Sequence, residues 1–574
     1  MTPLLQTSMM FPTADLPSSD LFRYVPEHLT VSERINLSHE RAKAIGLRYK
    51  LTIDDVLQPT QKFWNMYRDY AVTLDGAAVA LFSIQLNLAA GTLAPFVKQR
   101  PELQSLLDDM LTFRVSAQFL LTELGHGLDA PHLETSAVMQ TDGSFIIHTP
   151  NARAAKFMPP TLPFGGVPRV GILFARLAVR GEDRGIRPFI VPLNDGKSMC
   201  KGITARELPT RVGSRSFGHA LTYFDNVRLA PSALLGSPQK VDDERAHFLK
   251  MIWRVGIGSL SLTSTVPAVL KLAAYITATY SKRRCVTGPR NQLIPIISFR
   301  TQQIPILHAM AQGFVLDSFY QQATKWFSEI SPDNVDERNA IAAIVKATMI
   351  GHWRRTGCTL ADRCGAQGMF DCNQITSLEM ELRGAAIAEG DVLVLALRLV
   401  PELLLNRYSV PCSQDPNSLL SQHERGLSEE MMSIFKNSGE HHRGDFFNRM
   451  LLPRCLPLVE AIGQRMALEA TVEAGVPEPL VRLYEIGAVG TDLGWYNEHG
   501  LITRSDFLGK EDTALSDVYS HLQDYLDMMD IAPYAVAAIT SDASWEKFED
   551  SLKVHKGNAA YSPLPSEMQF SARL

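Results

Sequence analysis

Apolar residues recur at every third or fourth position from about Ser18 to Leu121, as in the stripe Leu103, Leu106, Leu107, Met110 and Leu111. This spacing predicts amphipathic helices. From about Thr122 to Gly236 the pattern changes to short runs of branched and aromatic residues, separated by Gly, Asn and Asp. The runs are 144–148, 170–179, 188–193 and 221–229. They predict a compact β domain.

Helical spacing resumes from Asp242 to about Tyr408, and Ser409 to Asn417 is rich in Pro, Ser, Asn and Asp, which marks a linker. A second helical unit runs to about Val554. The predicted fold is therefore mainly α with a central β domain. Its predicted parts are an N-terminal helical domain (1–121), a middle β domain (122–240), a helical bundle (241–410), a linker (411–425), a C-terminal helical domain (426–560) and a tail (561–574).

Two apolar stretches approach the length of a membrane span. The stretch 77–97 is interrupted by Gln85 and Asn87, and 255–280 contains several Ser and Thr residues with Lys271. Both are predicted to be buried helices, and no membrane span is expected. Residues 1–21 carry no Lys or Arg, so no signal peptide is expected either.

The composition argues against several classes of function. The chain has 574 residues, with 56 Lys and Arg against 61 Asp and Glu, a net charge of −5, so nucleic acid is not an expected partner. Its seven cysteines lack paired spacing, which argues against a disulfide framework or a zinc ribbon and predicts a reduced, intracellular protein. No metal site is predicted, because Glu440-His441-His442 with Asp445 completes no coordination shell.

Two motifs flank the predicted β domain. In Thr122-Glu123-Leu124-Gly125-His126-Gly127 a helix would break at two glycines and offer backbone amides to an acceptor such as the edge of a flavin ring. The alternative is a helix end followed by a turn. In Tyr223 to Leu229, Asp225 and Arg228 are placed to pair across a turn.

Three further motifs lie in the bundle. Arg283-Arg284 follows a predicted long helix, and Gln302-Gln303 begins another. A pair of guanidinium groups suits a pyrophosphate, and glutamine amides suit adenine or ribose. The alternative is that these residues form a solvated basic helix end. The small residues of Arg363 to Gly368 let a backbone approach a phosphate. Ala388-Glu389-Gly390-Asp391 begins an apolar helix. The Glu389 carboxylate either points into a cavity or is an acidic residue at a helix N-terminus, where the helix dipole stabilises it.

Taken in order, these motifs resemble the acyl-CoA oxidases of the flavin-dependent acyl-CoA dehydrogenase superfamily, over about residues 20 to 560. The resemblance implies an N-terminal helical domain, a β-barrel-like middle domain, a four-helix bundle that forms a homodimer and completes the FAD site, and an extra C-terminal helical domain.

The resemblance also implies site residues. Glu389 would be the catalytic base, with its own backbone N–H bound to the thioester carbonyl, and Glu379 and Glu381 are the next candidates. The implied FAD-binding residues are Thr122, Leu124, Gly125 and Gly166 near the flavin, Arg283, Arg284, Gln302 and Gln303 at the adenine dinucleotide, partly across the dimer, and Gly365 and Gly368 at the pyrophosphate.

The implied reaction is FAD-dependent oxidation of an acyl-CoA to the trans-2-enoyl-CoA, with dioxygen reduced to hydrogen peroxide. One alternative is a biosynthetic acyl-thioester desaturase of the same fold, with a specialised substrate or another electron acceptor. The other is a catalytically silent helical interaction protein, against which Glu389 argues. Departures from the family pattern at Ala366, Gln367, Ala388 and in Lys156 to Pro160 leave the length, branching and oxygenation of the acyl group open.

The last three residues, Ala572-Arg573-Leu574, resemble the tripeptide read by the peroxisomal import receptor. This predicts a peroxisomal location, which suits an enzyme that makes peroxide.

Overall fold

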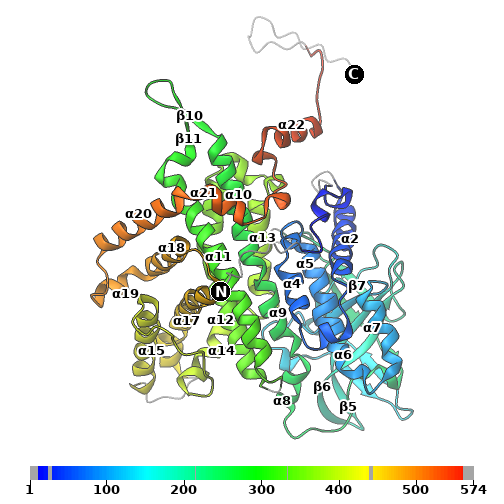
Figure 1. Ribbon diagram of the computed structural model, residues 1–574. Helices are drawn as coiled ribbons and strands as arrows, with labels where there is room; N and C mark the ends of the chain where they lie inside the picture. The colour runs from blue at the N-terminus through cyan, green and yellow to red at the C-terminus, as the bar shows by residue number, and fades with distance from the viewer. Residues whose placement is uncertain are drawn as a thin grey trace, which may run out of the picture.

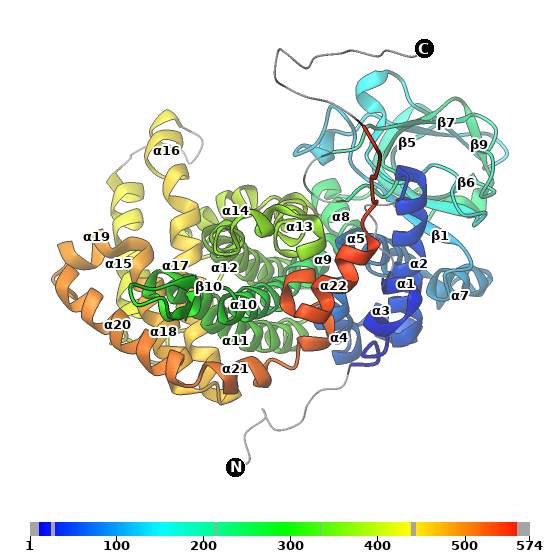
Figure 2. The same cartoon turned by 90° about the horizontal axis from the view of Figure 1, so that it is seen from above.

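The computed structural model describes residues 11–23, 29–211, 213, 215–332, 334–437 and 444–559. The β domain and the N-terminal helices lie on one side of a central bundle of long helices, and the C-terminal helices lie on the other (Figures 1 and 2). The predicted fold class, mainly α with a central β domain, is confirmed. The tail with Ala572-Arg573-Leu574 lies outside the described residues, as do Glu440, His441 and His442.

The N-terminal domain is helical, as predicted. Its elements are α1 (Asp20–Arg23), α2 (Val31–Tyr49), α3 (Ile53–Leu57), α4 (Gln61–Arg68), α5 (Gly76–Phe82), the π-helical segment η4 (Ser83–Ala90), α6 (Gly91–Val97) and α7 (Gln104–Leu111). Thr30 with Glu33 and Thr52 with Asp55 form capping boxes, which satisfy the first backbone amides of α2 and α3.

The β domain contains two sheets. Its strands are β1 (Ser116–Leu120), β2 (Ser136–Met139), β3 (Phe145–His148), β4 (Lys156–Phe157), β5 (Arg169–Val179), β6 (Glu182–Asn194), β7 (Ile203–Glu207), β8 (Ala220–Phe224) and β9 (Val227–Leu229). The larger sheet has the order β1-β5-β2-β3-β9, with β6 antiparallel to β5, and the smaller one is β4-β8-β7. β1 and β2 both run parallel to β5, beside its first and second halves.

Two predictions about this domain are wrong. The β domain begins at β1, inside the range predicted as helical up to Leu121, because the alternating residues 116–120 pair with β5. Asp225 and Arg228 do not pair with each other: the Arg228 guanidinium bonds Asp142 in the β2–β3 turn, because β9 lies next to β3.

The bundle supplies the longest helices. It comprises α8 (Glu244–Met251), α9 (Arg254–Thr263), α10 (Thr265–Arg283), the hairpin β10 (Cys285–Thr287) and β11 (Leu293–Pro295), α11 (Arg300–Glu329), α12 (Val335–Asp362), α13 (Ile375–Ile387) and α14 (Val392–Leu404). A buried ion pair joins the bundle to the N-terminal domain: Asp317 of α11 bonds Arg68 of α4 at 2.6 Å and Lys271 of α10 at 2.9 Å.

The C-terminal domain begins earlier than predicted. Its helices are α15 (Leu419–Asn437), α16 (Asp445–Met450), α17 (Leu452–Ala474), α18 (Glu478–Val489), α19 (Leu493–Glu498), α20 (Arg504–Ser520), α21 (Leu522–Met528) and α22 (Asp542–Ser551). Because α15 starts at Leu419, the predicted linker 411–425 is too long at its C-terminal end. From α21 the chain returns past α10, and the segment before α22 contacts the N-terminal domain, where the Tyr70 hydroxyl donates to the Met529 carbonyl oxygen at 2.9 Å.

The helical stretches Gly76–Val97 and Arg254–Arg283 are long and apolar enough to cross a membrane. In each stretch, 89% of the most apolar 18-residue segment is buried inside the protein. Helices of this kind are also common in protein cores, so their length and composition are weak evidence for a span.

Candidate active site

Glu389 lies in the short turn that joins α13 to α14. Its φ is 53° and that of Gly390 is 104°, so two successive residues are left-handed. A glutamate in this region costs on the order of 1–3 kcal/mol and persists only where its surroundings enforce it. Asp391 ends the turn and caps α14 by accepting hydrogen bonds from the amides of Leu393 and Val394, at 3.0 and 3.1 Å.

The carbonyls of Ala388, Glu389 and Gly390 all accept hydrogen bonds from side chains of neighbouring helices. Lys346 of α12 donates from Nζ to the carbonyl oxygens of Ala388 at 2.5 Å and Gly390 at 2.6 Å. Ser259 of α9 donates its hydroxyl to the carbonyl oxygen of Glu389. The turn is therefore fastened to the bundle on both sides of the glutamate.

The Glu389 carboxyl group points inward. Asn87, in the π-helical segment of the N-terminal domain, donates from Nδ2 to Glu389 Oε2 at 3.2 Å. A Cβ atom on Gly258 would lie 1.1 Å from the same oxygen and 2.9 Å from Asn87 Nδ2, so only glycine leaves room for this contact. Gly258 thus packs against the carboxyl group.

Burial raises the pKa of the Glu389 carboxyl to about 7. The positive charges of Lys346 and Arg254 and the Asn87 hydrogen bond oppose this rise. The group therefore changes protonation state near neutral pH, which suits a general base.

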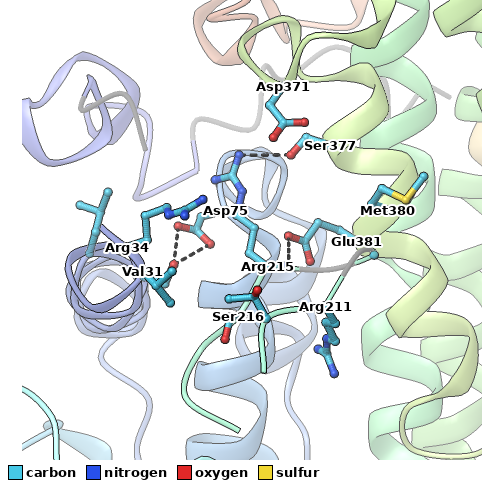
Figure 3. Close-up of a pocket in the computed structure, with 14 residues that line it drawn as sticks. Val31, Arg34, Asp75, Arg211, Arg215, Ser216, Asp371, Ser377, Met380 and Glu381 are labelled. Carbon is cyan, nitrogen blue, oxygen red and sulfur yellow. Dashed lines mark hydrogen bonds between the residues drawn. The ribbon is translucent and has the colours of Figure 1, made fainter. Parts of the chain in front are cut away.

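A cavity of about 370 Å³ lies between α2, the β7–β8 loop and α13 (Figure 3). Glu381 lines it and accepts a hydrogen bond from the Arg215 backbone amide at 2.8 Å, while the Arg215 side chain reaches Ser377 at 3.1 Å. Burial raises the pKa of the Glu381 carboxyl to about 7 as well. The other candidate, Glu379, is committed to Arg383 at 3.1 Å and accepts from the Cys358 thiol at 2.9 Å.

The motif at Thr122 follows strand β1 and forms an extended loop, so neither a broken helix nor a helix end stands there. The amides of Leu124 and Gly125 donate to the carbonyls of Ala155 and Arg153, at 2.9 and 2.8 Å. The expectation that these amides are available to an outside acceptor is therefore wrong. The Leu124 side chain is 49% exposed. Gly166 lies in a left-handed turn with φ 68°, and a Cβ atom there would touch nothing within 4 Å.

The predicted dinucleotide residues of the bundle meet at one end of it. The Gln302 side-chain amide donates to Ser281 Oγ and to the Arg363 carbonyl oxygen, both at 2.8 Å, and so joins α10, α11 and α12. Arg284 and Gly365 lie at the ends of α10 and α12. We call Arg284, Gln302, Arg363 and Gly365 the bundle-end cluster.

Three other predicted cofactor ligands contact other parts of this chain. Arg283 donates to the Ile539 carbonyl oxygen at 2.8 Å and to Asp542, which anchors the segment before α22. Gln303 is 5% exposed and donates to the Ile297 carbonyl oxygen at 3.0 Å. Gly368 packs on α12, because a Cβ atom there would lie 2.0 Å from the Ala361 carbonyl oxygen. A contact of these three with a cofactor stays a prediction.

The bundle-end cluster fits a phosphate-containing cofactor. Within the part of the chain that the structure describes, the buried Arg363 Nε has no hydrogen-bond partner. The Arg284 side chain at the end of α10 is exposed, and a Cβ on Gly365 would meet no atom within 4 Å. Guanidinium donors beside an open glycine turn are the groups that a pyrophosphate requires.

Several residues around Glu389 were not predicted to belong to the site: Asn87, Arg254, Gly258, Ser259 and Lys346. The sequence does carry a signal for two of them. Asn87 interrupts a long apolar run, and Lys346 is the only charged residue between Ala340 and Ile350. A polar residue on an otherwise buried helix face needs a partner, and here the partners are the Glu389 turn and its carboxyl group.

Comparison with known proteins agrees with this architecture. Residues 257–404, which span α9 to α14, match the family model of the acyl-CoA oxidase C-alpha1 domain. A probable acyl-CoA oxidase of Caenorhabditis elegans is 25% identical over 315 residues, 52% of this chain and 48% of the relative. A putative peroxisomal acyl-CoA oxidase of Arabidopsis thaliana is 24% identical over 541 residues, 86% of this chain and 80% of the relative.

The fold also matches a solved structure, acyl-CoA oxidase-1 of Caenorhabditis elegans in complex with FAD and ATP. The TM-score is 0.71 at 15% identity, and the match covers 93% of this chain and 91% of that one. The chain thus has the acyl-CoA oxidase fold and is acyl-CoA oxidase-like. It spans about half the length of the first of the two relatives and four fifths of the second.

Proposed function

We propose that the protein is a flavin-dependent oxidoreductase that converts an acyl-CoA to its trans-2-enoyl-CoA, with Glu389 as the base. The observation that carries this proposal is the Glu389 turn: a buried carboxyl group with a pKa of about 7, fixed on a left-handed turn by two helices. The similarity to acyl-CoA oxidases supports the same reaction class.

Glu389 performs the proton transfer in this proposal. As the carboxylate it accepts the proton from Cα of the acyl group, next to the thioester carbonyl. Its backbone N–H is the proposed hydrogen-bond donor to that carbonyl oxygen, where negative charge develops. Burial of the carboxyl group keeps it a stronger base than a solvated glutamate.

FAD is the proposed cofactor. When bound, it supplies the acceptor for the hydride that leaves Cβ and delivers the electrons to dioxygen, giving hydrogen peroxide. The proposed ligands are Arg284, Gln302, Arg363 and Gly365 of the bundle-end cluster and Thr122 and Gly166 of the β domain. The Caenorhabditis elegans structure, which is a complex with FAD, supports FAD as the cofactor.

We propose a homodimer through the bundle end. Exposed apolar side chains gather around the bundle-end cluster: Val286, Leu293, Phe299, Met369 and Phe370. Leu293 and Met369 are both 73% exposed, and the β10–β11 hairpin that carries Leu293 projects from the bundle (Figure 1). A second copy would bury these side chains, as expected at a homodimer interface.

The proposed location is the peroxisome, on the strength of the C-terminal tripeptide Ala572-Arg573-Leu574 and of relatives named peroxisomal acyl-CoA oxidases. The import receptor is the proposed partner of the tripeptide.

A biosynthetic desaturase acting on a specialised, oxygenated acyl group is the second candidate. It is favoured by the three charged side chains Glu381, Asp75 and Arg211 in the lining of the 370 Å³ cavity.

One experiment tests the reaction class. The purified protein should be yellow, with at most one non-covalent FAD per chain, and some member of a panel of plain and oxygenated acyl-CoAs should bleach it without oxygen. Peroxide formed on admitting air distinguishes an oxidase from a desaturase with another acceptor. A colourless protein that takes up no FAD on reconstitution removes the basis of the proposal.

A further inference from the structure

Lys346 is an unusual residue for the middle of a bundle helix. Its side chain is 0% exposed, and the acceptors that its ammonium group meets are the two carbonyl oxygens on either side of Glu389. Burying an ammonium group is costly unless it is paired, and carbonyl oxygens are weaker partners for it than a carboxylate. Packing alone would be served better by an apolar side chain at this position.

We propose that Lys346 is a positioning residue for Glu389, which acts by holding the backbone of the glutamate turn in its left-handed conformation. A single ammonium group bridges the carbonyls of Ala388 and Gly390, and Ser259 holds the carbonyl between them. Rotation of the Glu389 backbone would break at least one of these bonds. The carboxyl group is thereby kept against Gly258 and within hydrogen-bond distance of Asn87.

The charge of Lys346 has a second effect. The charged and titratable groups that act on the Glu389 carboxyl are Lys346 of α12, Arg254 of α9 and Tyr67 of α4, and Asp391 of the same turn acts on Lys346. Lys346 opposes the rise that burial gives to the pKa of Glu389. Burial in turn lowers the pKa of Lys346 to about 8, against the attraction of Glu389 and Asp391. Lys346 therefore keeps part of the glutamate ionised at neutral pH while it holds the turn.

The inference rests on the proposed role of Glu389 as the base, so its test is made independent of turnover. Infrared difference spectra of the purified holoprotein between pH 5 and 9 report the C=O band of protonated carboxyl groups. The component missing in Glu389→Gln belongs to Glu389. We expect the titration midpoint of this Glu389 band near pH 7 in the native protein.

In Lys346→Met the midpoint should rise by about one pH unit or more, a tenfold change in proton affinity, because the positive charge is removed. Lys346→Gln, which keeps a hydrogen-bond donor without the charge, should show the same rise. Lys271→Met is the matched control: Lys271 is also buried but bonds Asp317, so the Glu389 midpoint should not move. A folded Lys346→Met protein with the native midpoint overturns the inference.

Ser259→Ala keeps the test decisive if the Lys346 variants do not fold. Loss of the bond to the Glu389 carbonyl should slow the reduction of bound FAD by acyl-CoA about 10- to 100-fold, as expected for a misplaced base. Ser261→Ala, on the same helix and bonded instead to the Gly258 carbonyl oxygen, is its control and should react at the native rate. Equal rates in the two serine variants count against positioning of the turn. If no acyl-CoA reduces the flavin but the midpoint moves in Lys346→Met, the proposed function fails while the contact of Lys346 with the Glu389 turn is still supported.

Discussion

At the scale of single residues, the protonation state of Glu389 decides the pH dependence. Since burial raises the pKa of its carboxyl group to about 7, the group is mostly protonated at pH 6 and mostly ionised at pH 8. Only the ionised form accepts a proton from the substrate. The rate of FAD reduction at saturating acyl-CoA should therefore rise with pH through about 7, as measured by stopped-flow absorbance. A rate that is flat from pH 5 to 9, with chemistry limiting, would exclude this carboxyl group as the base.

Gly258 gives a second prediction at this scale. In Gly258→Ala the new methyl group would overlap Glu389 Oε2, so the carboxyl group must move. A misplacement of about 1 Å can cost 10²-fold in rate, and we expect a loss of this order in FAD reduction with acyl-CoA binding retained. Gly256→Ala is the control on the same helix, because its Cβ would meet Asn339 instead. Equal rates of FAD reduction in the two alanine variants would contradict the contact of Gly258 with the Glu389 carboxyl group.

At the scale of helices and strands, the structure separates the two arginines at the end of α10. Arg283 bonds Ile539 and Asp542 of the C-terminal segment, whereas the Arg284 side chain is exposed at the end of α10. Arg284→Ala should weaken FAD retention without lowering the unfolding temperature, because charge-assisted bonds to phosphate are lost. Arg283→Ala should instead loosen the C-terminal segment and increase its proteolysis. FAD titration and limited proteolysis of both variants check this division, which fails if Arg283→Ala alone loses FAD.

The helices were predictable from the sequence where their apolar spacing is regular. The stripe at Leu103 to Met110 became α7, and the apolar run after Asp391 became α14. The start of the β domain was missed because β1 is short and follows α7 after only four residues, Thr112 to Val115, so the change of period is hard to see.

The order of the motifs led to Glu389, but the residues that position it could not be found in the same way. Asn87, Gly258 and Lys346 lie on three different elements, and only tertiary packing brings them to one carboxyl group. The amides near Gly125 were misjudged for a similar reason. Their acceptors, the carbonyls of Arg153 and Ala155, lie about 30 residues away in sequence.

At the scale of the whole molecule, the exposed apolar side chains around the bundle-end cluster predict association. Replacing Met369 and Phe370 with serine should weaken the dimer, because these are large exposed apolar groups at its proposed interface. FAD affinity should fall with it if the site is completed across the dimer. Light scattering and FAD titration on the same samples measure both effects. Leu128→Ser, an equally exposed apolar residue in the β domain, is the control. A native protein that is monomeric and still retains FAD would contradict the proposed dimer.

The most direct test of the central claim is single-turnover reduction of bound FAD in Glu389→Gln. The variant keeps the size of the side chain and the backbone N–H but cannot accept a proton. Mixed without oxygen with an acyl-CoA that bleaches the native protein, it should bind the ligand with native affinity. It should reduce its flavin about 10²–10⁴-fold more slowly. Reoxidation of chemically reduced flavin by air should keep its native rate. Flavin reduction at the native rate in Glu389→Gln would show that another group, with Glu381 the first candidate, takes the proton.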